Sequence, residues 1–247
     1  MSGHSKWAGI KHKKALVDAK RGKLFTKLIR EITVAAKRGG GDPGSNPRLR
    51  TAIQAAKDAN MPAANIERAV KKGTGELPGV HYEDMLIEGY APGGVAVMAE
   101  IVTDNRNRTA AEIKHLFSKS GGRQGEPGCV SWLFQKKGLI IIDENKSSED
   151  RLLEISLEAG ADDLKKEEDT FVITSSSENF QRVKEAIMKE NIECNLAEIT
   201  MLPQNTVKLE GKDAERALRL VEALEEHDDV QHVYANFDVP DEMLERI

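Results

Sequence analysis

The sequence has few of the residues that mark secreted, disulfide-stabilised or membrane-spanning proteins. Its 247 residues include 2 cysteines and only 4% aromatic residues, and its longest aliphatic run extends from Leu139 to Ile142. Two cysteines make no disulfide framework, and a membrane-spanning helix needs about 18 to 20 apolar residues in succession. The basic N-terminus lacks the apolar segment of a secretory signal. We therefore expect a cytoplasmic protein with no membrane segment.

Charge is distributed very unevenly along the chain. The net charge is −5, but residues 1–73 carry +12 and residues 138–247 carry −16. A strongly basic segment within an acidic chain is typical of proteins that bind polyanions. We predict that the basic segment contacts nucleic acid. The acidic region would repel it, so we expect that region to face outward or to bind a ribosomal or transcription-machinery protein.

Residues 1–76 are predicted to form a basic helical domain. Between residues 20 and 38, apolar residues recur at helical spacing and cations gather on the opposite face. The apolar positions are Leu24, Phe25, Leu28, Ile29, Ile32, Ala35 and Ala36, and the basic positions are Lys20, Lys23, Lys27, Arg30 and Lys37. Glu31 is the only carboxylate in this stretch. Because a solvated face usually mixes signs, the pattern favours an anionic partner.

Two shorter helices are predicted to follow. The glycine-rich residues 39–44 must form a loop, after which Asn46 offers an N-cap and Pro47 a first helical position. Asn60-Met61-Pro62 interrupts the pattern, and a third helix ends near Gly73. Two short helices across a tight break resemble a helix-turn-helix, but the same spacing fits any small helical bundle.

The rest of the chain alternates strands with helices, so the predicted fold class is α+β. After a linker at 74–80, residues 82–136 and 204–240 are predicted to form one discontinuous ferredoxin-like α/β lobe. The acidic residues 137–203 have the order strand, helix, strand, strand, helix, strand and are predicted to be a second ferredoxin-like lobe inserted into the first. The first lobe's expected elements are strands at 85–90, 95–103, 129–134, 206–210 and 230–237, helices at 106–119 and 212–226, and a loop at 121–128.

Candidate nucleic-acid contacts lie on an N-terminal arm, on the first helices and after the strand that ends near residue 103. Lysine and arginine neutralise phosphates, and tryptophan can stack on an exposed base. The alternative is that Trp7 pins the arm to the helices and the cations are simply solvated. The candidates are His4, Lys6, Trp7, Lys11, Lys13, Lys14, Lys20, Arg21, Lys23, Lys27, Arg30, Lys37, Arg38, Arg48, Arg50, Arg106 and Arg108.

Local signatures of catalysis are missing from the sequence. It contains no G-x-S-x-G, H-E-x-x-H or Walker motif, and His4 and His12 lack partners at metal-ligand spacing. The run Glu225–Asp229 could hold a metal, but an exposed helix end explains it more simply. We expect no enzyme, no cofactor and no metal. The alternative is a hydrolase or nuclease-type enzyme whose active site assembles from distant residues.

Seven runs of residues, which span residues 3 to about 135 and are specific in combination, resemble the YebC family. They are Gly3–Lys14, Asp18–Lys27, Gly39–Pro43, Asn46–Arg50, Asn65–Ala69, Glu88–Ala96 and Thr103–Thr109. Farther on, the resemblance is in length and element order. Ser2 and the loop Gly125-Glu126-Pro127 depart slightly from the family pattern.

The resemblance implies a three-lobed cytoplasmic regulator of gene expression without catalytic residues. Bacterial members are described as probable DNA-binding transcriptional regulators. The mitochondrial relative is a translational activator for a cytochrome c oxidase subunit, and some bacterial relatives help ribosomes through proline-rich stretches. Since the chain opens directly on the first motif, we expect a bacterial member.

The distribution of the cations mildly favours ribosomal RNA over a DNA site. The cations are spread over an arm, a helix face and a second lobe, whereas a transcription factor concentrates them on one recognition helix. In the DNA alternative, Arg48, Arg50 and Gln54 would be the residues that read bases.

Overall fold

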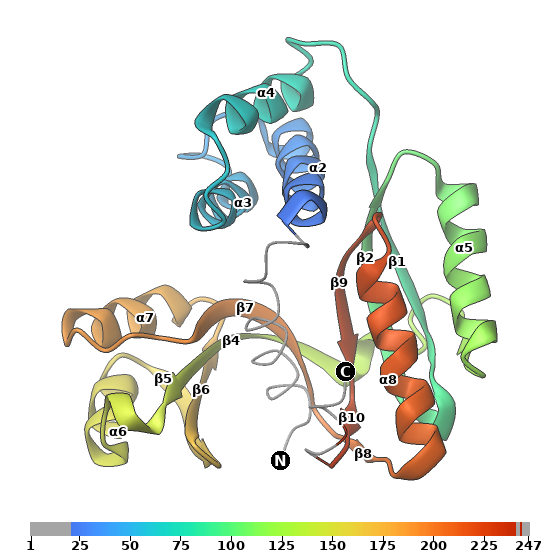
Figure 1. Cartoon of the computed structure of the whole chain (residues 1–247). Coiled ribbons are helices and arrows are strands. Elements are labelled where there is room, and N and C mark those ends of the chain that lie inside the picture. Colours follow the sequence, from blue (N-terminus) through green and yellow to red (C-terminus); the bar gives the residue numbers. More distant parts are fainter. Residues whose placement is uncertain (1–20, 241–242, 244–247) are drawn as a thin grey trace. The chain divides into compact units, whose positions relative to one another are not determined.

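The computed structural model describes residues 21–240 and 243 (Figure 1). The chain divides into two compact units. Of the described residues, the first unit contains Arg21–Val130 together with Gly211–Val233, and the second contains Ser131–Glu210 and the residues from Tyr234 onward. Among the described residues, no helix combines the length and the apolar character needed to cross a bilayer.

The first unit begins with three helices, α2 (Arg21–Gly39), α3 (Pro47–Asp58) and α4 (Ala63–Thr74). The central helix α2 packs against both of the others, whereas α3 and α4 touch each other little. The apolar stripe predicted for α2 meets Leu49 of α3 and Ile66 of α4 in one core. The predicted helical domain is therefore a small bundle organised around α2.

One buried side chain, Asn46, holds the connection between α2 and α3. Its Oδ1 accepts the N–H of Leu49 at 3.1 Å, as expected of an N-cap. Its Nδ2 donates to the carbonyls of Ala35 at 2.8 Å and Gly40 at 2.9 Å. A Cβ on Gly39 would lie 2.6 Å from Nδ2, so glycine is required beside this amide. The predicted cap is confirmed, and it also ties the glycine loop to the end of α2.

The remainder of the first unit is a four-stranded sheet with two helices. Its strand order is β3-β1-β2-β9, and β1 and β2 form the predicted antiparallel hairpin. The elements are β1 (Glu83–Tyr90), η2 (Pro92–Gly94), β2 (Ala96–Thr103), α5 (Arg106–Lys119), β3 (Arg123–Gln124), α8 (Gly211–Glu226) and β9 (Val230–Ala235). Helices α5 and α8 contact each other, and their buried faces include Ile113, Phe117 and Leu218. The bounds of α5 coincide with the prediction.

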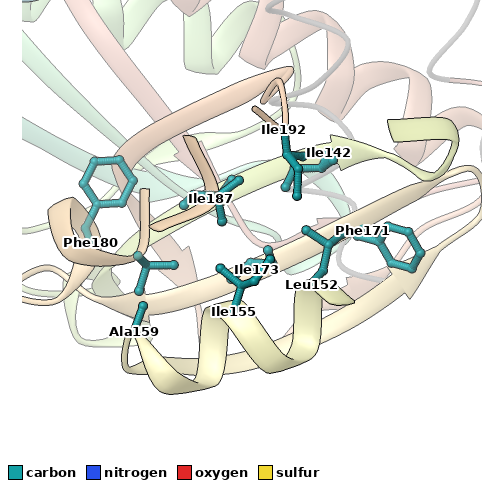
Figure 2. Packing of buried hydrophobic residues seen from close by; sticks show 11 residues of the cluster. Ile142, Leu152, Ile155, Ala159, Phe171, Ile173, Phe180, Ile187 and Ile192 are labelled. Carbon is teal, nitrogen blue, oxygen red and sulfur yellow. The ribbon is translucent and has the colours of Figure 1, made fainter. Parts of the chain in front are cut away.

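The second unit contains the predicted strand and helix order. Its sheet has the antiparallel order β5-β6-β4-β7, the strand order of a ferredoxin-like fold. The elements are β4 (Phe134–Asp143), η4 (Glu144–Lys146), α6 (Glu149–Glu158), β5 (Ala161–Glu167), β6 (Thr170–Ser176), α7 (Phe180–Lys189) and β7 (Leu196–Pro203). Figure 2 shows how Ile142, Phe171 and Ile173 of the strands face Leu152 and Ile155 of α6 and Ile187 of α7. The α+β fold class is confirmed.

Two details of the predicted first lobe are wrong. The segment 129–134 is not a strand, because it holds the short 3-10 helix η3 (Ser131–Leu133) and the strand begins only at Phe134. The cause is the buried carboxylate of Glu88, which accepts the N–H groups of Gly128 at 2.7 Å and Val130 at 2.8 Å. The loop predicted at 121–128 contains the short strand β3, which pairs with the end of β1.

The C-terminal strands also pair differently from the prediction. Of the two expected to complete the sheet, only β9 joins it. The other, β8 (Val207–Lys208), pairs in parallel with β10 (Phe237–Asp238) and forms a separate two-stranded sheet. The chain departs from β9 at Asn236, whose carbonyl accepts the N–H of Val207 at 2.7 Å. This hydrogen bond starts the second pairing.

Gly73 tests the close crossing of α2 and α4. A Cβ at this position would clash with the carbonyl of Thr33 and would lie 2.7 Å from Cβ of Ala36. We expect Gly73→Ala to lower the free energy of unfolding by about 1–3 kcal/mol, because the helices must move apart. Gly22→Ala is the control in α2, where nothing lies within 4 Å, and it should be neutral or stabilising by up to about 1 kcal/mol. Urea unfolding followed by circular dichroism measures both, and equal stabilities would contradict the crossing.

Candidate nucleic-acid interface

The described part of the chain contains ten of the predicted contact residues. His4, Lys6, Trp7, Lys11, Lys13, Lys14 and Lys20 lie outside the described residues, and Arg21 is the first residue of α2. Of the others that belong to the bundle, Lys23, Lys37, Arg38 and Arg50 are exposed. These four side chains come from α2 and α3, so the exposed predicted cations of the bundle do not lie on a single helix.

Two cations of the predicted basic face of α2 bind the C-terminal end of α8 instead. Lys27 Nζ donates to the carbonyl of Glu225 at 2.7 Å. Arg30 Nη1 donates to the carbonyl of Asp228 at 2.5 Å and to Oδ1 of Asp229 at 2.6 Å. Unpaired carbonyls give a helix C-terminus a partial negative charge, which attracts cations. Lys27 and Arg30 therefore fix α2 against the α/β part of the first unit.

Asp229 is the centre of this contact. Its side chain is only 3% exposed, and its Oδ2 accepts hydrogen bonds from Arg108 at 2.7 Å and Thr109 at 2.6 Å, with Thr103 at 3.2 Å. Burial favours the neutral carboxyl, but the hydrogen bonds from Thr109 and Arg108 and the charge of Arg30 outweigh it. They hold the pKa of Asp229 below its usual value. Asp229 is therefore a buried anion between two guanidinium groups.

Arg48 forms a second ion-pair cluster. Its guanidinium contacts Glu31 Oε1 at 2.6 Å and Glu31 Oε2 at 2.9 Å, and it also contacts Asp84 at 3.0 and 3.1 Å. The hydrogen bonds to Glu31 exceed the cost of burial and raise the pKa of Arg48 above its usual value. Arg38 reaches the same Asp84 at 2.7 Å, although its side chain remains 62% exposed. The cluster joins α2 and α3 to the start of β1.

Arg106 and Arg108 begin α5, where Asn105 accepts the N–H of Arg108 as the N-cap. Arg106 lies 3.6 Å from Glu83, in a contact that leaves its side chain 59% exposed. Arg108 pairs with Asp104 as well as with Asp229. Arg106 thus keeps most of its surface for an outside partner, whereas Arg108 is shared between internal carboxylates.

Four further exposed cations of the bundle were not predicted as contacts. They are Lys57 of α3 and Arg68, Lys71 and Lys72 of α4. A signal was present, since residues 68, 71 and 72 have the spacing of one helical face opposite the buried Ile66 and Ala69. Lys71 and Lys72 also occupy the last turn of α4, where cations stabilise the helix.

Glu112, His227 and Asp229 come close enough together to suggest a metal site. The existing contacts argue against that function. His227 Nε2 lies 3.0 Å from Glu112, and its Nδ1 accepts the N–H of Asp229 at 3.2 Å. Both oxygens of Asp229 already face guanidinium groups. A metal ion would have to displace these partners, so the group serves the ion-pair cluster.

The two cysteines are not poised nucleophiles. Burial and the charge of Glu88 raise the pKa of the Cys129 thiol, and burial raises that of Cys194. Because the thiolate is the reactive form, both thiols are less reactive at neutral pH than an exposed cysteine.

These observations define a class, that of α+β proteins in which a small helical bundle with exposed cations precedes α/β lobes. Comparison with known proteins identifies the family within this class. Residues 5–76 match the family model described as TACO1/YebC protein N-terminal domain, and residues 82–237 match the model described as TACO1/YebC second and third domain. The chain belongs to the TACO1/YebC family, and the resemblance inferred from the sequence is confirmed.

Relatives match over essentially the whole chain. A protein from Pelotomaculum thermopropionicum is 60% identical over 98% of this chain and 100% of its own length, and one from Syntrophobacter fumaroxidans is 59% identical over 100% of both. Each is named probable transcriptional regulatory protein. The crystal structure of the conserved hypothetical protein Aq1575 from Aquifex aeolicus has a TM-score of 0.82 and 53% identity, and the match covers 94% of this chain and 96% of that one.

Asp229→Asn tests the buried ion pair. We expect a loss of about 3 kcal/mol in the free energy of unfolding at pH 7, because the guanidinium of Arg30, 15% exposed, loses its charged partner. The folded-state pKa of Asp229 is lowered below its unfolded-state pKa of about 4. This stabilisation is therefore fully present above the unfolded-state pKa, and it is lost as the pH falls through the folded-state pKa. Urea unfolding at a series of pH values should show the two proteins converging in acid.

The matched control is Asp228→Asn, at an exposed neighbour. It should change stability by less than about 0.5 kcal/mol at any pH. If Asp228→Asn lowered the free energy of unfolding as much as Asp229→Asn, negative charge near the end of α8, and not the buried ion pair, would support the fold.

Proposed function

We propose that the chain is a cytoplasmic, non-enzymatic regulator of gene expression, and that its helical bundle binds the phosphate backbone of structured RNA, as on a ribosome. The names of its relatives support a regulator of the YebC type. The observation that carries the RNA mode is the composition of the exposed faces of α3 and α4, which offer cations for phosphates and few groups that read bases.

A helix-turn-helix protein contacts base edges with the N-terminal residues of its second helix. In α4 these residues are Ala63 and Ala64, which are exposed and have no hydrogen-bonding side chain, and Asn65, which is only partly exposed. Of the cations of α4, Arg68 lies at the middle of the helix, and Lys71 and Lys72 lie in its second half. Phosphate contacts from these cations would fix the orientation of the protein on the nucleic acid and would not read its base sequence.

The side chains predicted to read bases have partners within the chain. Arg48 is held by Glu31 and Asp84. Arg50 donates to the carbonyl of Pro43 at 3.0 Å, and Gln54 donates to Asp58 at 2.8 Å. Reading a base would require each to exchange an internal contact for an external one. This favours recognition of RNA shape over a DNA sequence, and it leaves the acidic residues 138–247 for a protein partner.

Replacement of Lys57, Arg68 and Lys71 together by glutamine tests this surface. These exposed cations make no ion pair with the described residues, so their loss should leave the fold intact. We expect weaker binding to RNA of any sequence, and a logarithmic salt slope that falls by about 0.7 to 0.9 per lost phosphate contact. Fluorescence anisotropy at several salt concentrations measures both.

A control variant removes the same charge elsewhere, with Lys189, Lys212 and Arg216 changed to glutamine. These residues are also exposed, but they lie on α7 and α8. Equal loss of affinity in the two variants would show that net charge alone, and not the bundle surface, attracts RNA.

Crosslinking in growing cells decides between RNA and DNA. We expect nucleic acid recovered with the protein to be sensitive to RNase and to map to a ribosomal site. Recovery of DNA clustered at promoters would instead establish the transcription-factor mode, and recovery of no nucleic acid would reject the proposal.

A further inference from the structure

A pocket of about 360 Å³ lies where the C-terminal ends of α2 and α4 meet the linker that leads to β1. Its volume falls within the range of small-ligand sites. Two lysines line it, Lys37 from α2 and Lys72 from α4, together with His81 from the linker. The lining residues, all within the described chain, include no aspartate or glutamate. The pocket therefore has a positive electrostatic character.

The fold brings these cations together for identifiable reasons. Gly73 lets α4 approach α2 closely, which places the last turns of the two helices beside each other. Gly75, in the left-handed region with φ of 83°, ends α4, and Leu77 then donates its N–H to the carbonyl of Lys71 at 3.1 Å. The linker thus folds back over the helix end. The stem of Lys72 packs on Gly79, where a Cβ would lie 3.3 Å from it.

The polar groups of the pocket suit a phosphate. Lys37 Nζ lies 2.6 Å from His81 Nε2 and 3.2 Å from Nδ1, so the ammonium group and the imidazole are in direct contact. The Lys72 ammonium makes no hydrogen bond or ion pair with any described residue. Two lysines line one cavity whose lining includes no carboxylate, and an anion bound there would offset the repulsion between their charges.

The remaining wall is apolar, which a simple anion would not need. Val34 and Tyr82 line it, and Val80 is 54% exposed. The guanidinium of Arg30 lies 5.6 Å from the Tyr82 ring centroid, and Arg30 is itself fixed by Asp229. An aromatic ring and aliphatic side chains beside two cations match a nucleotide, since the base packs on the apolar wall while the phosphate pairs with the lysines.

We propose that this pocket binds one unstacked nucleotide, with its phosphate between Lys37 and Lys72 and its base against Val80 and Tyr82. The inference rests on the proposed function, which it deepens by naming a site for a single-stranded nucleotide apart from the cations of the bundle surface. The same chemistry is offered by a free nucleotide and by a nucleotide within a strand, so the test includes both.

Isothermal titration of the full chain measures binding of tetraadenylate RNA, adenosine 5′-monophosphate and inorganic phosphate. We expect saturable binding of the tetranucleotide and weaker binding of phosphate. Equal affinity for the tetranucleotide and the monophosphate assigns the site to a free nucleotide and supports the same chemistry. Equal affinity for inorganic phosphate and the monophosphate would overturn the role of the apolar wall.

Val80→Glu places a carboxylate in the pocket at an exposed position. We expect it to weaken tetranucleotide binding about tenfold or more, because a carboxylate repels the phosphate. Leu157→Glu makes the same change at a residue of α6 that is 50% exposed, and it should alter binding less than twofold. Equal urea midpoints for the variants and the wild-type chain confirm that the fold is intact.

Lys37→Gln combined with Lys72→Gln is a second, independent variant, and it should weaken tetranucleotide and monophosphate binding alike. Unchanged binding in both pocket variants, while the wild-type chain still binds structured RNA, would overturn the pocket and leave the proposed function standing. Failure of the wild-type chain to bind any nucleic acid would overturn the proposed function, and with it the pocket.

Discussion

The buried carboxylate of Asp229 determines how the first unit is assembled. It follows the end of α8, and it accepts hydrogen bonds from Arg30 of α2 and from Arg108 and Thr109 of α5. Three helices distant in the sequence are thus fixed by one side chain that is almost inaccessible to water. Burial of a single charge is unfavourable unless it is paired, so these partners stabilise the buried carboxylate and Asp229 in turn orients them.

This arrangement divides the cations of α2 between two roles. Lys27 and Arg30 hold the helix against the α/β part, whereas Lys37, about two turns beyond Arg30, lines the pocket at the end of α4. The basic character of the bundle surface then depends on Lys23, Lys57, Arg68 and Lys71, which are exposed. Only some of the cations counted in the sequence therefore lie on a surface that is available to nucleic acid.

Local patterns were sufficient to predict most elements. Asn46 and Pro47 marked the start of α3, and the bounds of α5 followed from its capping residues and apolar spacing. The errors came from contacts remote in sequence. Glu88 takes the amide groups of Gly128 and Val130, which removes an expected strand, and no local pattern reveals a partner forty residues away. Likewise, helical spacing identified the basic face of α2 but could not show that Asp229 lies beneath it.

The distance along the chain between Arg30 and Asp229 has a consequence for synthesis. The two residues are 199 positions apart, and β9, which completes the first sheet, follows Asp229 directly. At about 5 to 20 residues per second, a ribosome makes Asp229 roughly 10 to 40 seconds after Arg30. During that interval the nascent bundle carries its basic side chains without their final carboxylate partner. The first unit therefore reaches its finished charge distribution only after Asp229 has been made.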